Sequence, residues 1–151
     1  DPRVSVGYED GAEYAKKHQA EYDIIIVDST DPVGPGIVLF QEPFYRSMKG
    51  CLRKNWIAIT QSESFFDEPR IIQSLCSFVP SVFKYWGYYW TCVPTYPSGI
   101  IGFSFVSDSV DPYNLEIDSN RIPKDLRYYN KEIHKAAFSV PEFAKEIIAK
   151  A

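Results

Sequence analysis

The stretch at residues 22–36, YDIIIVDSTDPVGPG, constrains the fold more than any other part of the chain. Residues 24–27 are an uninterrupted β-branched run, which is typical of a strand buried on both faces in a parallel sheet covered by helices. Asp28 and Asp31 follow in a loop that is broken by proline and glycine. Because open α/β sheets bind ligands at the carboxyl ends of their strands, we expect the binding site at this loop.

Apolar periodicity predicts further strands and helices on both sides of this stretch. We expect strands at residues 4–6, 56–61, 82–92 and 100–106, and helices at 11–18, at about 38–50 and from Pro69 onward. The last two strands flank a loop rich in proline and glycine, so they should form an antiparallel pair near one edge of the sheet. A loop at 107–124 and short helices, the last opening at Pro141, should follow. This order predicts an α/β fold with helices on both faces of its sheet.

One component of a doubly wound nucleotide-binding fold is absent before Asp28. Such a fold normally begins with a strand, a glycine-rich turn and a helix whose amino end faces the ligand. Only Gly7 and Gly11 precede Asp28 here. Either the ligand is not a nucleotide or the chain is a fragment of a longer protein.

The composition excludes several classes of protein. With 151 residues, 45% of them hydrophobic, the chain is expected to form one globular domain. A net charge of −4 without a basic block argues against a nucleic-acid or anionic-membrane partner. No apolar run is long enough to span a bilayer and no targeting signal is visible, so we expect a cytoplasmic protein. The spacing of Cys51, Cys76 and Cys92 indicates neither a disulfide framework nor a metal site.

The acidic loop suits a protonated amine. An aliphatic amine has a pKa near 10, so an enzyme that uses it as a nucleophile must bind a cation and then remove a proton. Asp28, fixed at the strand end, is the candidate base, and Asp31 is the candidate anchor for the cation. The same residues also suit the capping of turns, and their spacing does not decide between the two roles.

Three further side chains are candidates for the same site. Tyr96 lies between two prolines, where it is better placed to present its hydroxyl than to pack in a core. Gln61 and Glu63 follow the neighbouring strand and could reach the same crevice, although either could equally be an exposed loop residue. Asp10, with Glu13 three residues later, fits a capping box at the start of a helix.

The motifs DSTDPVGP and PTYPSG, together with QSES and the tail YYN…H…AAF, resemble the spermidine synthases, an aminopropyltransferase family. The resemblance extends over nearly the whole chain. It implies transfer of an aminopropyl group from decarboxylated S-adenosylmethionine, a co-substrate, to putrescine, without a metal or cofactor. The resemblance implies that Asp28 is the general base. It implies that the amine is bound by Asp31, Tyr96, Gln61 and Glu63, and that the nucleoside is contacted by Asp10, Gly11, Pro35 and Leu39.

The resemblance also implies the architecture and the assembly. Residues 1–151 match the carboxyl-terminal portion of the catalytic domain, a partial Rossmann-like sheet of the class I methyltransferase type. The amino-terminal β-domain and the glycine-rich cofactor-binding segment of the family lie upstream of the matching region, so we expect this portion alone to be inactive and unable to complete the native sheet. The complete protein is expected to be a homodimer or larger.

Two alternatives and two departures from the family pattern stay open. Putrescine N-methyltransferases share much of this region and use S-adenosylmethionine itself, and a non-catalytic paralogue or subunit would keep the same fold.

After Pro35 the family usually continues Ala-Glu, where this chain has Gly36 and Ile37. A tryptophan of the family is missing after Ser64, where Phe65 and Phe66 occur instead. Both departures bear on the shape of the pocket.

Overall fold

Strands and helices alternate along the first half of the chain, as predicted. The structure is a computed structural model that describes residues 1–149. Among these residues, no helix is long and apolar enough to cross a membrane. The elements in order are α1 (Gly11–Lys17), β1 (Tyr22–Val27), the 3₁₀ helix η1 (Gly34–Phe40), α2 (Glu42–Cys51), β2 (Leu52–Gln61), α3 (Pro69–Val82), β3 (Tyr85–Cys92), β4 (Ile100–Ser107), the 3₁₀ helix η2 (Ser119–Arg121), α4 (Lys131–Ala137) and α5 (Glu142–Ala149).

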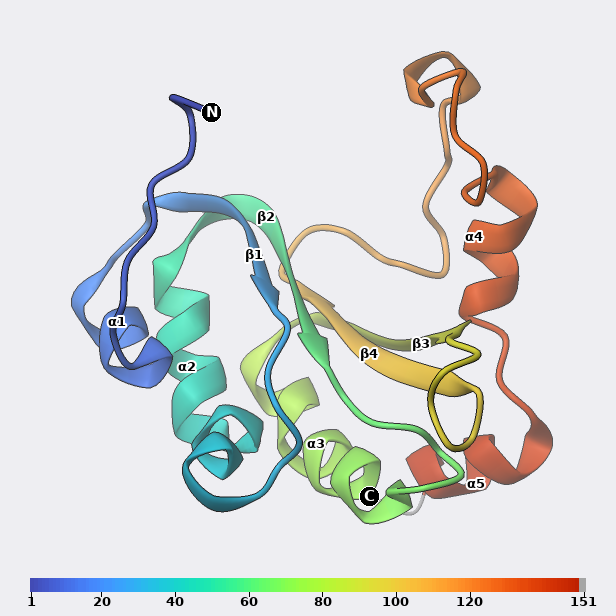
Figure 1. The fold of residues 1–151 in the computed structure, drawn as a ribbon, viewed down its shortest axis with the longest axis horizontal. Coiled ribbons are helices and arrows are strands. Elements are labelled where there is room, and N and C mark those ends of the chain that lie inside the picture. The colour runs from blue at the N-terminus through green and yellow to red at the C-terminus, as the bar shows by residue number, and fades with distance from the viewer. Residues whose placement is uncertain (150–151) are drawn as a thin grey trace.

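The strands form one four-stranded mixed sheet in the order β1-β2-β4-β3 (Figure 1). β1 pairs with β2 in parallel, and β4 runs antiparallel to both of its neighbours. The predicted antiparallel pair, β3 and β4, is therefore confirmed, with β3 at the edge of the sheet. The α/β fold class is confirmed as well.

One face of the sheet packs against α2 and α3. Their side chains, including Tyr45, Met48, Leu75 and Val79, surround Ala58 in a fully buried cluster. Tyr45 is the polar member of this layer, and its hydroxyl lies 2.6 Å from Thr60 Oγ1 on β2. Burial raises the pKa of the Tyr45 phenol to about 12, so it stays protonated and hydrogen-bonded at neutral pH. The helix stripes predicted from apolar spacing therefore do build the core.

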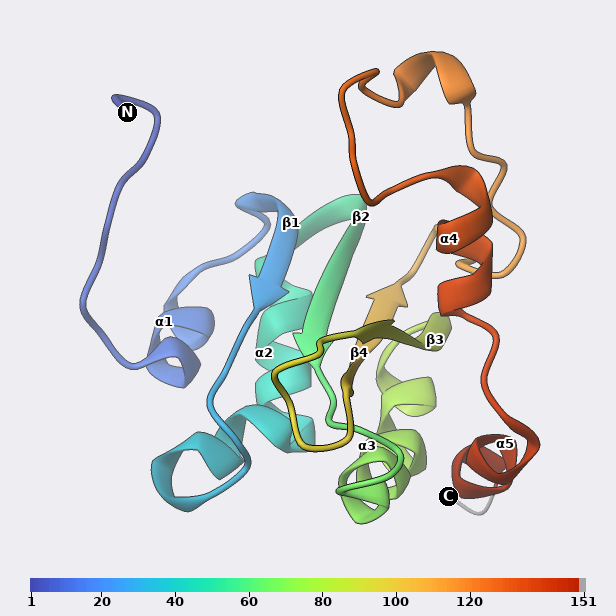
Figure 2. The ribbon, with the colours of Figure 1, turned by 45° about the vertical axis from the view of Figure 1, so that its right-hand side comes forward.

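The opposite face is covered only in part. α4 lies over β3 and β4 (Figure 2), and Phe138 at its end packs 5.2 Å from Tyr89, between ring centroids. Helices thus occupy both faces, as predicted. The expectation that β1 is buried on both faces was wrong, because Ile24 and Ile26 are 53% and 70% exposed. Among the described residues, β1 is the edge strand of the sheet, and no helix covers the face of β1 on which Ile24 and Ile26 are exposed.

Two other predicted elements differ from the structure. Residues 4–6 do not form a strand, and Val4 and Val6 are exposed, because the described chain offers them no neighbouring strand. The helix expected at 38–50 is divided at Gln41, whose extended backbone separates η1 from α2. Pro43 explains the division, because proline favours the first turn of a helix, where its missing N–H is not needed.

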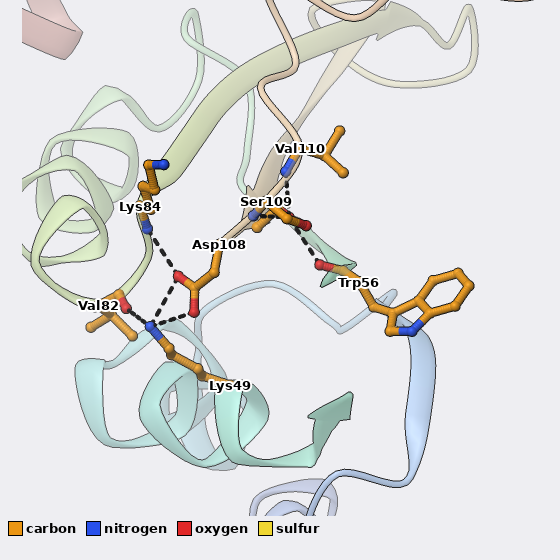
Figure 3. A network of polar contacts seen from close by, with 8 residues as sticks. Lys49, Trp56, Val82, Lys84, Asp108, Ser109 and Val110 are labelled. Atoms are coloured by element: carbon orange, nitrogen blue, oxygen red, sulfur yellow. Dashed lines mark hydrogen bonds and ion pairs between the residues drawn. The ribbon is translucent and has the colours of Figure 1, made fainter. Parts of the chain in front are cut away.

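A polar network fixes the end of the sheet at which β2 begins and β4 ends (Figure 3). Lys49 Nζ on α2 lies 2.7 Å from Asp108 Oδ2 and donates to the Val82 carbonyl at 2.6 Å. Asp108 also accepts from the Lys84 amide, and Ser107 Oγ donates to the Trp56 carbonyl at 2.9 Å. The ion pair is too exposed to add much free energy, but it ties α2, the end of α3 and the start of β3 together.

We predict that Gly102→Ala destabilises the chain by about 1–3 kcal/mol. A Cβ at Gly102 would overlap the Tyr88 hydroxyl and the Glu63 carbonyl oxygen, and the latter belongs to backbone that cannot move away cheaply. Urea unfolding followed by circular dichroism measures the loss. Gly11→Ala is the matched control, because nothing lies within 4 Å of its added Cβ. Equal stability of the two variants would contradict the packing described here.

Candidate functional site

Three loops meet at one end of the sheet. Residues 28–33 follow β1, the turn 61–64 closes β2, and residues 93–99 connect β3 to β4. Because β1 and β2 are parallel and β4 is antiparallel to β2, the ends of the first two strands lie beside the start of β4. The predicted position of the site, at the carboxyl end of β1, is therefore also where the Gln61 turn and the Tyr96 loop lie.

An acidic cavity of about 590 Å³ opens between these loops. Four predicted site residues line it, namely Asp31, Gln61, Glu63 and Tyr96. We refer to it as the acidic cavity, because Asp67 and Glu68 at the start of α3 also line it. A concave site of this size with several carboxylates suits a small cation.

The turn that carries Gln61 and Glu63 is held by hydrogen bonds to β3 and β4. The Ser62 amide donates to the Gly102 carbonyl at 2.9 Å, and the Ser62 hydroxyl donates to Ser104 Oγ at 2.7 Å. Tyr88 donates its phenol hydrogen to the Glu63 carbonyl at 2.8 Å. Glu63 itself has a positive φ of 63°, which is uncommon for a residue with a side chain. These bonds hold the backbone of the turn in that conformation.

The loop that carries Tyr96 is closed by its own backbone and attached to the same turn. The Val93 amide donates to the Gly99 carbonyl at 2.8 Å, and the Gly99 amide donates to the Tyr96 carbonyl at 2.9 Å. Gly99 has a φ of 73°, which favours glycine at this position. Ser98 Oγ donates to Ser64 Oγ at 3.0 Å. Tyr96 is thereby positioned at the acidic cavity, although the residue is 47% exposed.

Glu63 is the buried charge of the acidic cavity. Its residue is only 8% exposed, and Gln61 Nε2 donates to its Oε1 at 3.1 Å. Burial raises the pKa of the Glu63 carboxyl, and the nearby carboxylates of Asp31, Glu68 and Asp67 raise it further. No lysine, arginine or histidine within residues 1–149 pairs with it. A cationic ligand would supply the missing counter-charge.

A second, more apolar cavity of about 450 Å³ lies beside β1, next to α1 and α2. Asp28, Gly11 and Leu39 line it, together with Tyr14, Phe44 and Met48. We call it the apolar cavity. Asp28 follows Val27 directly, so the end of β1 fixes its backbone. One short loop therefore places Asp28 at the apolar cavity and Asp31 at the acidic cavity.

Two of the predicted residues line neither of these cavities. Asp10 is the N-cap of α1, and its Oδ1 accepts from the amides of Ala12 and Glu13 at 2.8 and 3.0 Å. Glu13 accepts from Lys16 Nζ at 2.6 Å, so only the aspartate half of the predicted capping box is seen in the described contacts. Pro35 is exposed in the first turn of η1.

Sequence reasoning missed the residues that support the site. Tyr88 and Gly102 hold the Glu63 turn but lie in β3 and β4, and only the register of those strands reveals their proximity. Asp67 and Glu68 stand four and five residues after Glu63, so the sequence alone could have indicated that they contribute carboxylates near it. Phe65 is 4% exposed and packs on Trp90 and Phe143, so it belongs to the core and does not line the acidic cavity.

The mixed sheet, with helices on both faces and a cavity at the carboxyl ends of its parallel strands, is a partial Rossmann-like sheet of the class I methyltransferase type. The profile of the Spermine/spermidine synthase domain matches residues 1–117, and the chain therefore belongs to the spermine/spermidine synthase family. It is 53% identical over 148 residues to the polyamine aminopropyltransferase of Leptospira biflexa, covering 98% of this chain and 53% of that protein.

Solved structures of the family agree with the fold. A spermidine synthase crystallised with the transition-state analogue AdoDATO superposes with a TM-score of 0.91 at 34% identity, covering all of this chain and 53% of that one. Spermidine synthase from Thermotoga maritima gives a TM-score of 0.85 at 30% identity, covering 51% of its chain. The chain thus spans about half the length of the relatives that it matches.

We predict that Glu63→Gln raises the stability of the chain at neutral pH. The folded-state pKa of this carboxyl lies above its unfolded value, so the ionised form disfavours folding above that folded pKa. The gain should shrink as the pH falls through the raised pKa and vanish below the ordinary glutamate range. Urea midpoints measured from pH 4 to 8 test this, with the exposed Glu116→Gln as control. A gain that does not depend on pH would contradict the buried, unpaired charge.

Proposed function

We propose that the protein containing this chain transfers an aminopropyl group from decarboxylated S-adenosylmethionine to a diamine such as putrescine. The observation that carries the proposal is the division of carboxylates between the two cavities. Asp28 lines the apolar cavity with Gly11 and Leu39, and Asp31 lines the acidic cavity with Glu63. Family membership supports the same reaction, because relatives that match this chain are named polyamine aminopropyltransferases and spermidine synthases.

The reaction is a displacement at a carbon bonded to a sulfonium. The lone pair of the amine nitrogen forms the new N–C bond, the C–S bond breaks, and its electron pair returns to sulfur. The products are a neutral thioether, methylthioadenosine, and a secondary ammonium. One proton must leave the attacking nitrogen, which is bound as a cation at neutral pH. The positive sulfonium already makes sulfur a good leaving group, so the protein chiefly has to bind, align and deprotonate the amine.

The residues divide this work by their positions. Asp31 and Glu63 in the acidic cavity attract the ammonium groups, and Gln61 and Tyr96 supply polar atoms that orient the chain of the amine. Asp28, at the start of the same loop, lines the apolar cavity and takes the proton from the attacking nitrogen. The predominantly apolar lining beside Gly11 and Leu39 suits the nucleoside and its sulfur substituent.

A hybrid protein tests the proposed function. This chain replaces the matching segment of the Leptospira biflexa polyamine aminopropyltransferase, and the natural relative serves as the positive control. Formation of spermidine and methylthioadenosine from putrescine and decarboxylated S-adenosylmethionine is the expected result. Binding of putrescine by the hybrid without any turnover would identify a non-catalytic protein.

Asp28→Asn in the hybrid should lower kcat by about 10²–10⁴-fold, because the attacking nitrogen loses its general base. The KM for putrescine should change much less, since the acidic cavity is intact. Initial rates over a range of putrescine concentrations separate the two constants.

Asp31→Asn is the complementary variant and should mainly raise the KM for putrescine. It removes one charge from the acidic cavity and leaves the base in place. If both variants lowered only the melting temperature and left kcat and KM unchanged, Asp28 and Asp31 would be turn-capping residues and the division of roles would be wrong.

A further inference from the structure

We propose that Ser98 is a positioning residue for the proposed reaction, because its hydroxyl ties the loop that carries Tyr96 to Ser64. It thereby sets where the Tyr96 hydroxyl stands at the acidic cavity. The inference rests on the proposed function and deepens it by naming a residue that acts through an amine-binding side chain. Ser98 itself does not line the acidic cavity, whereas Tyr96 and Pro97 do. Its effect on the amine is therefore indirect.

The Tyr96 side chain is held only by the loop that carries it. Within residues 1–149 its hydroxyl makes no hydrogen bond, and its ring contacts no other aromatic ring. The residue is also 47% exposed, so packing constrains it little. The position of the Tyr96 hydroxyl therefore follows the position of the loop backbone.

The loop itself is restrained internally. The Val93 amide donates to the Gly99 carbonyl, the Tyr96 amide donates to the Val93 carbonyl at 3.0 Å, and the Gly99 amide donates to the Tyr96 carbonyl. Pro94 and Pro97 fix two of the φ angles between these bonds. A loop with these restraints behaves as one unit, so a bond that holds it at any residue also positions Tyr96.

Ser98 supplies the one hydrogen bond that joins this unit to another loop in the described part of the chain. Its Oγ donates to Ser64 Oγ at 3.0 Å, and no other hydrogen bond described there links residues 93–99 to a neighbouring loop. The Ile100 carbonyl, at 3.4 Å from the same Oγ, is the more distant acceptor. Loss of the Ser98 hydroxyl should therefore release the loop from its neighbour.

Ser64 is a well-fixed acceptor for this bond. It is 2% exposed, its Oγ accepts from the Phe66 amide at 3.1 Å, and its carbonyl accepts from the Glu68 amide at 3.0 Å. Phe65, the next residue, is buried in the core. Because Ser64 directly follows Glu63, the bond from Ser98 fixes the Tyr96 loop relative to the turn that carries Glu63.

A double-mutant cycle in the hybrid protein tests whether Ser98 acts through Tyr96. Ser98→Ala should raise the KM for putrescine about fivefold, as expected for one lost hydrogen bond, with a smaller change in kcat. In a Tyr96→Phe background the same substitution should raise the KM no further, because the hydroxyl that it positions is already gone. Ser77→Ala is the matched control, since it removes an exposed hydroxyl that donates to the Ser74 carbonyl within α3.

Equal effects of Ser98→Ala on the KM in both backgrounds would overturn the inference, because Ser98 would then act on the amine independently of Tyr96. An unchanged KM in Ser98→Ala beside a raised KM in Tyr96→Phe would also overturn it and leave the amine-binding role of Tyr96 in place. If Tyr96→Phe alone left the KM unchanged, that role would fall together with the inference.

Amide hydrogen exchange of the 151-residue chain, followed by mass spectrometry, tests the bond without turnover. Ser98→Ala should speed exchange in peptides that cover residues 93–99, because a loop released from Ser64 opens more often. Ser77→Ala should leave this exchange unchanged, and the same result in Ser98→Ala would overturn the inference. If the hybrid formed no spermidine, the proposed function would fail, whereas faster exchange would still show that Ser98 holds the Tyr96 loop.

Discussion

Parallel pairing of β1 with β2, followed by the antiparallel return of β4 beside β2, is the constraint on which the site depends. It brings three loops that are far apart in sequence to one end of the sheet. Each loop then contributes polar groups: Asp28 and Asp31 after β1, Gln61 and Glu63 at the end of β2, and Tyr96 before β4. Slipping β1 against β2 by one residue would turn the side chains of β1 to the other face and move its acidic loop relative to the Glu63 turn.

The acidic cavity is assembled at the expense of local stability. Glu63 combines a positive φ with a buried charge, and neither feature favours folding by itself. The Tyr88 hydroxyl and the backbone of Gly102 hold this turn, and the absence of a side chain at residue 102 makes room for both contacts. Such an arrangement is understandable when a cationic ligand completes it. Helix α2 supports the sheet through the Tyr45–Thr60 hydrogen bond and the Lys49–Asp108 ion pair.

Much of this organisation was readable from the sequence, and the limits have physical causes. Apolar spacing and Pro69 predicted α3, and the β-branched run predicted β1, because those signals are local. Burial of Ile24 and Ile26 was predicted wrongly. A β-branched run indicates a strand, but it does not show whether other parts of the chain pack on both faces of that strand. The motifs placed Asp31, Gln61, Glu63 and Tyr96 together correctly. Tyr88 and Gly102 were missed because their role depends on the register of β3 against β4, which only the folded chain reveals.

A crystal structure of the hybrid protein with an analogue that joins an adenosyl group to a diamine tests the central claim most directly. We expect the amine arm in the acidic cavity, with ammonium nitrogens at Asp31 and Glu63 and the adenosyl group in the apolar cavity. The nitrogen that corresponds to the nucleophile should lie within about 3 Å of an Asp28 carboxylate oxygen. An amine arm outside the acidic cavity, or a nucleophilic nitrogen without contact to Asp28, would contradict the division of work between the two aspartates.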